Sequence, residues 1–299
     1  MDQLHLMKVF VGVGEEESFA AASRRLDLSP AAVTRAIGAL EEQLGVKLLT
    51  RTTRSVRLTE PGRRYLDDCR QILASIAEAN DAVAGENAAP RGHLSVTASV
   101  LFGKAFVMPC IVRYLKEYPA VEVSAWLLDR TMNLMDEGID VAVRIGHLPD
   151  SGMRAIRVGQ VRRVLCASPE YLAQHGVPEH PADLLHHTVI AASGISPRVD
   201  WKFGGTDDAT SVRMHPRLTV TSNDGALLAA VSGLGIARLL SYQVNEDVAA
   251  GRLRLVLESY EEEPWPVHIL HRETRFGSAK VRAFIDMLAQ HLREHPHLR

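Results

Sequence analysis

Near the start of the chain, the pattern of apolar and polar residues predicts two short helices separated by a tight turn at 27–28. The first helix is Ala-rich and spans 18–26. Ser29 is a favourable N-cap for the second helix, Pro30 suits its first position, and Gly45 ends it. Apolar residues recur at helical spacing along the second helix, at Ala32, Val33, Ala36, Ile37 and Leu40. Two helices joined in this way form a helix-turn-helix, in which the second helix can enter the major groove of DNA.

The segments on either side complete a small domain with a long helix. An apolar face over 4–13 predicts a helix that packs beneath the pair, and 48–58 reads as two short strands of a basic β-wing. From about 61 to 84, apolar positions alternate in steps of three and four, as in a coiled coil. These positions are Leu66, Cys69, Leu73, Ile76, Asn80 and Val83. We predict that this helix joins two copies of the chain, with Asn80 fixing their register. The alternative is that it packs on its own domain.

From His93 onward, strands alternate with helices. The predicted order is a strand at 94–98, a helix at 103–118, a strand at 121–127, a helix at 131–137 and a strand at 141–145. A β-α-β-α-β order indicates a parallel sheet covered by helices.

A second α/β unit is predicted from about 162. Its expected strands are 164–167, 189–192, 201–203 and 217–220, and its expected helices are 169–174, 223–232 and 239–246. A strand at 264–270 then returns to the first sheet, and an amphipathic helix at 280–293 closes the chain. We predict three parts, 1–60, a linker at 61–89, and 90–299. The last part divides into subdomain I (90–161 with 267–299) and subdomain II (162–266), linked by two crossovers.

The charge distribution supports a nucleic-acid partner. Residues 24–64 contain nine basic and four acidic residues, a local balance of +5, whereas the whole chain carries −2. Since phosphate contacts supply much of the affinity for DNA, basic residues concentrated in one segment are informative.

Composition narrows the class of protein further. With 46% hydrophobic and 23% charged residues, the chain has the composition of a folded globular protein. Neither a secretory signal nor a membrane span is expected, so we predict a cytoplasmic protein without a membrane partner. The three cysteines are isolated, as in a reducing compartment. Cys166, which follows two arginines, could be a redox sensor, but a small buried hydrophobe is the favoured interpretation.

The first 60 residues resemble the winged helix-turn-helix of LysR-type transcriptional regulators, a bacterial family. The matching motifs are 7–10 (MKVF), 18–22 (SFAAA), 32–37 (AVTRAI), 40–41 (LE), 44–46 (LGV), 48–49 (LL), 51–52 (RT) and 58–62 (LTEPG). Members usually carry Gln-Pro after the serine at position 29. This chain has Pro30-Ala31 instead and so lacks an amide that could contact a base or a phosphate.

Residues 90–293 resemble the effector domain of the same family, which has the periplasmic-binding-protein fold. The matching pieces are 102–103 (FG), 118–119 (YP), 138–146 (GIDVAVRIG), 167–172 (ASPEYL) and 233–237 (GLGIA). The resemblance implies an α/β protein whose partners are double-stranded promoter or operator DNA, a small-molecule effector of unknown identity, and further copies of itself. Linker helices pair subunits into a homodimer, and effector domains pair to give a homotetramer. RNA polymerase is a further candidate partner.

The two resemblances assign candidate site residues. The candidate DNA-binding residues are Ser18, Ser29, Pro30, Ala31, Thr34, Arg35, Arg51, Thr52 and Arg54. The candidate effector-binding residues lie in loops beyond the strand ends, at Ser99, Val100, Phe102, Arg130, Arg144, Gly146, Ser193, Thr221 and Asn223. Ser99 could instead cap a helix, and Arg144 could pair with an acid. Helix N-termini and the two arginines favour an anionic or strongly polar molecule.

Other classes of protein fit less well. The motifs GxGxxG, GxSxG and HExxH and the P-loop are absent from the sequence, so no enzyme, cofactor or catalytic residue is predicted. His291 and His295 share a helix face, but no Glu or Cys completes a metal site. A periplasmic solute receptor would lack the DNA-binding segment. The sequence therefore favours a regulator.

Overall fold

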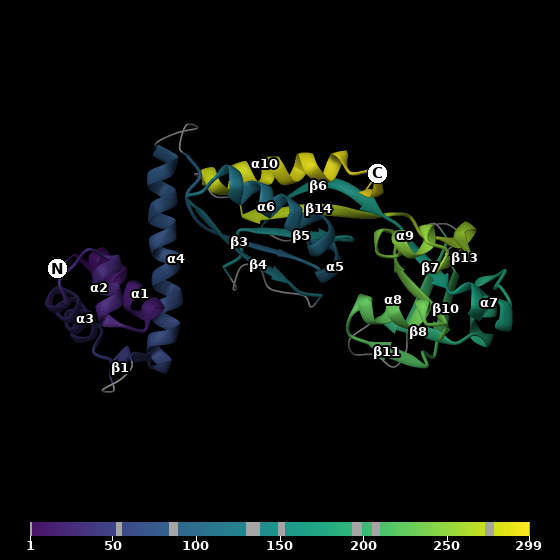
Figure 1. Cartoon of the computed structure of the whole chain (residues 1–299), viewed down its shortest axis with the longest axis horizontal. Coiled ribbons are helices and arrows are strands. Elements are labelled where there is room, and N and C mark those ends of the chain that lie inside the picture. Colours follow the sequence, from purple (N-terminus) through teal and green to yellow (C-terminus); the bar gives the residue numbers. More distant parts are fainter. Residues whose placement is uncertain are drawn as a thin grey trace. The chain divides into compact units, whose positions relative to one another are not determined.

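The chain folds into two compact units (Figure 1). The first unit comprises 1–88 with 276–278, and the second comprises 89–275 with 279–299. The computed structural model describes residues 2–51, 56–83, 89–129, 138–148, 153–192, 199–204, 210–272 and 278–298. Within these ranges, every helix is too short or too polar to cross a bilayer.

The first unit is a three-helix cluster with a two-stranded wing and a long helix. Its elements are α1 (Gln3–Glu16), α2 (Phe19–Arg25), α3 (Pro30–Leu44), β1 (Leu49–Arg51), β2 (Val56–Leu58) and α4 (Glu60–Val83). The Ser18 hydroxyl caps α2 by accepting the Ala21 N–H, and the Ser29 hydroxyl caps α3 in the same way. Gly45 ends α3 with a φ of 68°, in the left-handed region that favours glycine. The predicted caps, helix ends and wing strands are confirmed.

The long helix α4 packs on its own unit, which corrects part of the dimer prediction. Leu66 is 5% exposed and Cys69 fully buried in the same apolar core as α1 and α3, and Leu73 packs against that core. Gly62 permits this packing, because a Cβ there would lie 2.0 Å from the Leu48 carbonyl oxygen. The prediction that Leu66 and Cys69 contact a partner helix is therefore wrong. Ile76 is half-buried and Asn80 exposed; the Val83 side chain lies outside the described residues.

The second unit begins with a five-stranded sheet in the order β4-β3-β5-β14-β6. Its strands are β3 (Gly92–Ala98), β4 (Val121–Leu127), β5 (Val141–Ile145), β6 (Met153–Val161) and β14 (Trp265–Arg272). Strands β3, β4 and β5 are parallel, and β14 runs antiparallel to β5 and β6. The predicted helix at 103–118 consists of a π-helical turn, η2 (Gly103–Val107), followed by α6 (Met108–Glu117), and α5 (Val100–Phe102) precedes both. The predicted helix at 131–137 lies outside the described residues.

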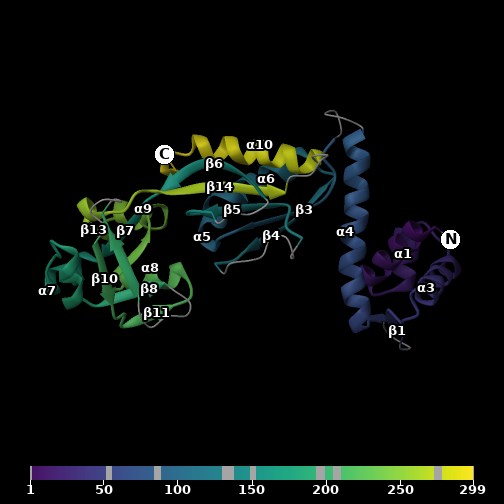
Figure 2. The same cartoon turned by 180° about the vertical axis from the view of Figure 1, so that it is seen from behind.

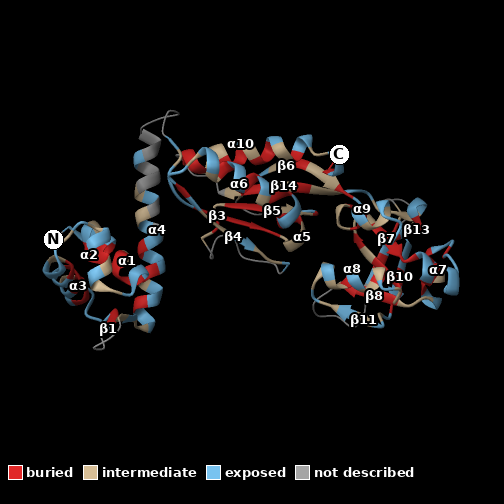
Figure 3. Cartoon of the chain, in the orientation of Figure 1, coloured by how far each residue is buried: buried red, intermediate tan, exposed pale blue. Residues whose placement is uncertain are grey.

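Helices α6 and α10 (Ala279–Glu294) cover one face of this sheet, and α10 runs alongside β6 and β14 in both views (Figure 2). The core between them contains Val143, Ile269 and Phe284. Figure 3 shows buried residues concentrated along the central strands. The opposite face carries a smaller cluster of Ile139, Ala142 and Leu270.

A second five-stranded sheet has the order β11-β8-β12-β7-β13. Its strands are β7 (Arg163–Ala167), β8 (Val189–Ala192), β11 (Leu218–Val220), β12 (Ile236–Leu240) and β13 (Arg254–Val256), beside a hairpin of β9 (Val199–Phe203) and β10 (Thr210–Met214). The helical segments around it are α7 (Pro169–His175), η3 (Pro181–His186), α8 (Asn223–Val231), α9 (Ser241–Ala249) and η4 (Glu258–Tyr260). The last segment, η5 (Pro296–Leu298), packs against β6, and Leu298 is buried in the core of the first sheet.

One helix boundary differs from the prediction. The helix expected at 239–246 begins only at Ser241, because β12 continues to Leu240 and pairs antiparallel with β7. Short apolar runs fit a buried strand and a helix equally well, so periodicity alone does not separate them.

Candidate DNA-binding surface and ligand pocket

The exposed face of α3 carries the candidate base-contacting residues. Val33, Ala36, Ile37 and Leu40 are buried, whereas Pro30, Ala31, Thr34 and Arg35 are exposed. The four exposed residues therefore share one side of the helix. Within the described residues, Arg35 forms no ion pair or hydrogen bond through its guanidinium, so all five of its N–H groups remain available.

The turn before α3 is fixed by local contacts. The Ser23 hydroxyl donates to the Leu28 carbonyl at 2.5 Å, and the Leu28 N–H donates to the Ser23 carbonyl at 3.0 Å. Asp27 adopts a left-handed φ of 52°, a conformation that Asp tolerates better than most residues. These contacts hold α3 at a defined angle to α2, as a helix that enters a groove requires.

A buried carboxylate at the end of α3 holds the wing. Glu41 is 8% exposed, and one of its oxygens accepts the backbone N–H groups of Leu48 (3.0 Å) and Leu49 (3.2 Å). Its other oxygen accepts Lys47 Nζ at 2.6 Å. Burial opposes ionisation, but the hydrogen bonds from Lys47 and the two N–H groups outweigh it and lower the pKa of Glu41. Sequence analysis missed this role, because nothing in the pattern marks one glutamate of a Glu-Glu pair as buried.

Ion pairs engage part of the basic charge counted in the sequence. Arg25 contacts Glu15 at 2.8 Å and Glu16 at 3.1 Å, and Arg63 contacts Glu60 at 2.7 Å. The local +5 therefore overstates the charge that is free to meet phosphate. Arg24 and Arg57, which were not among the predicted contacts, are exposed and form no ion pair within the described part of the chain.

Several candidate DNA contacts cannot be placed. Arg51 ends β1, but its side chain is outside the described residues, as are Thr52 and Arg54. Ser18 and Ser29 use their hydroxyls as helix caps.

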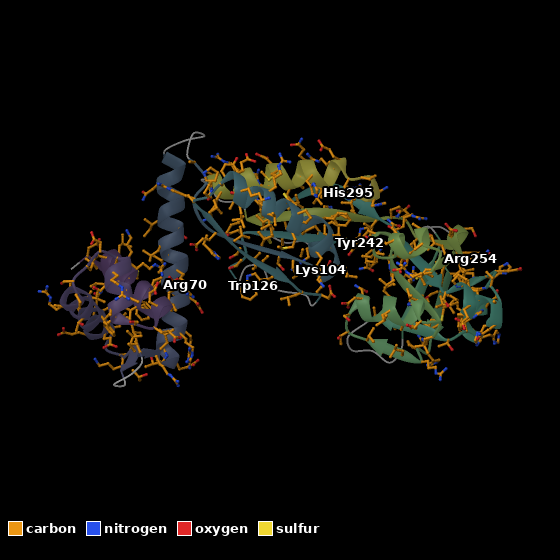
Figure 4. The ribbon with its side chains drawn as sticks, in the orientation of Figure 1. Arg70, Lys104, Trp126, Tyr242, Arg254 and His295 are labelled. Carbon is orange, nitrogen blue, oxygen red and sulfur yellow. The ribbon has the colours of Figure 1, made fainter. Side chains whose placement is uncertain are left out.

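The candidate effector residues after β3 belong to the interior of the second unit. Phe102 is fully buried; its ring lies 4.6 Å from that of Phe106 and 5.4 Å, edge-on, from that of Tyr242 in α9 (Figure 4). The prediction that Phe102 contacts an effector is wrong for this conformation, because its side chain fills the core. Val100 donates its N–H to Asp129 Oδ1 at 3.0 Å.

Ser99 stands at the N-cap position of α5, but its hydroxyl does not make a cap hydrogen bond. Its side chain hydrogen-bonds instead to Tyr242 of α9, whose pKa burial raises to about 12. The alternative of a helix cap is therefore confirmed for the position of Ser99 and not for its hydroxyl.

Two candidates lie at the end of β5, Arg144 within the strand and Gly146 directly after it. Gly146 has a φ of 108°, donates its N–H to the Pro266 carbonyl at 2.9 Å and lies against the Trp265 ring. Its role is structural, because its only donor is already used. Arg144 is half-buried, and burial lowers its pKa. The acid expected to pair with it is not found among the described residues.

The remaining candidates lie around the start of α8. Thr221 is exposed, and Asn223 begins the helix. A hydrogen bond from Ser222 lowers the pKa of Asp224, and the charge of Lys104 adds to the effect. Lys104 belongs to η2 (Figure 4), so the two subdomains approach each other here. Arg130 and Ser193 lie outside the described residues.

The cysteines are poor redox sensors. Cys69, Cys110 and Cys166 are buried, and burial raises the pKa of Cys110 to about 11 and that of Cys166 to about 12. Since the thiolate is the reactive form, these thiols are inert near neutral pH. The interpretation of Cys166 as a small buried hydrophobe is confirmed.

Two family models cover nearly the whole chain. Residues 4–63 match the bacterial regulatory helix-turn-helix protein, lysR family, and residues 87–293 match the LysR substrate binding domain. The HTH-type transcriptional activator AaeR of Escherichia coli (strain K12) is 33% identical over 296 residues, which cover 98% of this chain and 95% of AaeR. The HTH-type transcriptional regulator CrgA of Neisseria meningitidis is 31% identical over 287 residues, 96% of each chain.

Solved structures agree with this assignment. The CrgA structure matches with a TM-score of 0.62 at 30% identity and covers 96% of this chain and 98% of CrgA. The full-length structure of AphB, a virulence activator of Vibrio cholerae, matches with a TM-score of 0.61 at 26% identity, over 97% of this chain and all of AphB. The chain therefore belongs to the LysR family and is a DNA-binding transcriptional regulator with an effector-binding domain, not an enzyme.

Proposed function

We propose that α3 reads a specific operator through Thr34 and Arg35, with Pro30 and Ala31 at the helix entry. Arg24, Arg57 and the wing residues Arg51, Thr52 and Arg54 would hold the phosphate backbone. The observation that carries the proposal is the exposed, unpaired Arg35 on the outer face of a helix whose inner face is buried. Arginine can donate two hydrogen bonds to a guanine edge in the major groove.

The test compares three arginine variants in fluorescence anisotropy titrations. The probe is DNA from immediately upstream of the protein's own gene, measured at two salt concentrations against random DNA. Arg35→Ala should lose discrimination between the two DNAs, by roughly 1–3 kcal/mol. Arg57→Ala should weaken both equally and reduce the salt slope by about 1. Arg113→Ala, which removes an exposed arginine from α6, is the matched control.

The outcomes separate specific from general binding. If Arg35→Ala retained full discrimination while Arg57→Ala lost affinity, α3 would not be the reading helix. If wild-type protein bound neither DNA even at low salt, the proposal would fail altogether.

We further infer that the protein acts as a homodimer through the outward side of α4, and that its effector domains pair the dimers into a tetramer. Ile72 on α4 is 41% exposed, and Val112 and Trp126 on the second unit are 47% and 50% exposed. Large exposed apolar residues commonly mark protein interfaces. Sedimentation velocity on Ile72→Asp should give smaller particles than wild type, while Asp68→Asn, at an exposed position of the same helix, should not; unchanged particle size for Ile72→Asp would contradict the dimer face.

A small molecule bound to the second unit would regulate the complex. A ligand that binds one arrangement of the two subdomains more tightly shifts the population toward it and changes how the paired subunits hold DNA. RNA polymerase bound at the same promoter is the expected recipient of the signal. Because its target is DNA, we infer that the protein acts in the cytoplasm.

A further inference from the structure

A row of basic side chains crosses three adjacent strands of the first sheet of the second unit. His268 of β14 is paired with Arg144 of β5 on one side and with Arg157 of β6 on the other. Side chains at directly paired positions lie on the same face of a sheet. The neighbours Val143 and Ile269 point into the core beneath α6 and α10, so the basic row lies on the opposite face.

A pocket of about 390 Å³ lies beside this row, within the size range of small-ligand sites. It is lined by His147, Leu148, Arg157, Glu263, Pro264, Pro266 and His268. The lining therefore combines His147, which follows β5, and the mid-strand residues Arg157 of β6 and His268 of β14 with an apolar wall of Leu148 and two prolines.

Within the part of the chain that the structure describes, two hydrogen-bonding groups of the row are buried without a partner. Arg144 donates to the Val143 carbonyl through Nη1 at 3.4 Å, but its Nη2 has no partner. His268 Nδ1 is likewise buried and has no partner. Leaving a buried donor unsatisfied costs free energy, more for a charged group than for a neutral one. An acceptor that enters beside them would remove this cost, provided that His268 carries its proton on Nδ1.

The charges of the site favour a single negative charge. Arg144 and Arg157 contribute two positive charges, and Glu263 contributes one negative charge at the pocket rim. Burial, with the nearby Arg157 and His147, lowers the pKa of His268, so the imidazole is neutral near pH 7. A monocarboxylate with a small apolar body matches both this balance and the apolar wall.

A second hollow of the second unit, about 250 Å³ and lined in part by Arg162, Ser241, Asn245 and His297, has no buried polar group of this kind among the described residues. Several of its polar groups are already paired. The Arg162 guanidinium contacts Glu261 at 3.1 Å, and its backbone N–H donates to the Ser241 hydroxyl. Asn245 hydrogen-bonds to His297 at 3.1 Å.

We propose that the pocket between β5, β6 and β14 binds a small monocarboxylic acid, whose carboxylate meets Arg157 and His268, with Arg144 on the next strand adding positive charge, and whose apolar body rests on Leu148 and the prolines. The proposal names the chemical class of the effector. Only the effect of this ligand on DNA binding rests on the proposed function. Binding itself is independent of DNA.

Isothermal titration calorimetry on the full chain tests the binding. The probes are hexanoate and benzoate, each compared with its uncharged amide, and inorganic phosphate. The wild type should bind at least one carboxylate and neither amide. Arg157→Gln should weaken binding at least about tenfold, because it removes a charge-assisted hydrogen bond. Arg144→Met should weaken binding less, because it removes a neighbouring positive charge that does not line the pocket. Arg282→Gln, an exposed arginine of α10 on the other side of the sheet, is the matched control.

Each alternative result has a defined meaning. Arg157 is exposed, so its variant should unfold at the wild-type temperature and the measurement does not depend on Arg144→Met folding. The proposal is overturned if neither carboxylate binds at a concentration of about 10 mM, at which even a weak ligand would be detected. It is also overturned if the amides bind as well as the carboxylates, or if Arg157→Gln binds like the control. Phosphate binding as tight as that of the carboxylates would also overturn it, as a general anion site.

A second measurement separates this proposal from the regulatory one. Operator affinity is titrated with and without the carboxylate that binds. A carboxylate that binds but leaves DNA affinity and footprint unchanged would support the pocket and contradict its regulatory use. Arg35→Ala should lose operator discrimination and still bind the carboxylate.

Discussion

Replacing Glu41 by alanine tests whether a buried carboxylate holds the wing. The substitution leaves the backbone N–H groups of Leu48 and Leu49 without their acceptor. Both residues are buried, so these N–H groups cannot easily bond to water instead. An unsatisfied buried N–H costs about 1–3 kcal/mol. We expect a total of about 2–4 kcal/mol for the two groups, because water that enters the space left by the carboxylate would satisfy part of their hydrogen-bonding capacity. The lost contact with Lys47 adds little, because that side chain is 78% exposed.

Urea denaturation of the full chain measures how much unfolding free energy the first unit loses in the variant. Glu41→Gln should cost less than Glu41→Ala, since it keeps one acceptor oxygen. Glu42→Ala is the matched control: the neighbouring glutamate is exposed, and its substitution should change stability by less than about 0.5 kcal/mol. If Glu41→Ala were no more destabilising than Glu42→Ala, the wing would not depend on this carboxylate.

The depressed pKa of Glu41 also gives the effect a pH dependence. A carboxyl whose pKa is lower in the folded than in the unfolded protein contributes stability above its ordinary value of 4.5. That contribution is lost as the pH falls from 4.5 through the folded pKa. The difference in stability between wild type and Glu41→Ala should therefore shrink on acidification below pH 4.5, and a constant difference would contradict the assignment.

Three further predictions concern packing, a buried ion pair and the pocket. Gly62→Ala should destabilise the first unit by more than about 3 kcal/mol in thermal or urea unfolding, because its Cβ would overlap the Leu48 carbonyl; tolerance would contradict the close approach of α4. Glu262→Gln should destabilise the second unit by about 3 kcal/mol, because Arg238, only 4% exposed, would keep a buried charge without its carboxylate; unfolding at the wild-type urea midpoint would refute this. Carboxylate binding should tighten in calorimetry as the pH falls below 6.5, because burial lowers the pKa of His268 from that value and its protonation adds a positive charge to the pocket; a His268→Asn variant should lose most of this dependence.

Local chemistry made much of the first unit predictable. Ser18, Ser29, Pro30 and Gly45 each have conformational preferences that act within one helical turn, so helix starts and ends could be assigned from neighbouring residues alone. The alternation of strands and helices from 94 to 145 likewise indicated that β3, β4 and β5 are parallel, but it did not reveal the antiparallel strands that make both sheets mixed.

Contacts between distant segments were not predictable. The apolar stripe of α4 showed that one side is covered but not by what, and Leu66 and Cys69 turned out to contact their own unit. Phe102 follows a strand end, as a ligand-binding residue would, yet its ring is buried against Tyr242. The row of Arg144, Arg157 and His268 exists only through strand pairing, and no sequence spacing encodes it.

The outer face of α3 has a consequence for how readily this regulator can acquire a new operator. Thr34 and Arg35 contribute nothing to the buried core, and a side chain added at Gly38 would meet open space. Glycine inside a helix costs about 0.5–1 kcal/mol relative to alanine, so that position even offers a stability reserve. A library randomised at these three positions should therefore contain mostly folded proteins. Evolution can search DNA sequence preference here at almost constant stability, and so can a protein engineer.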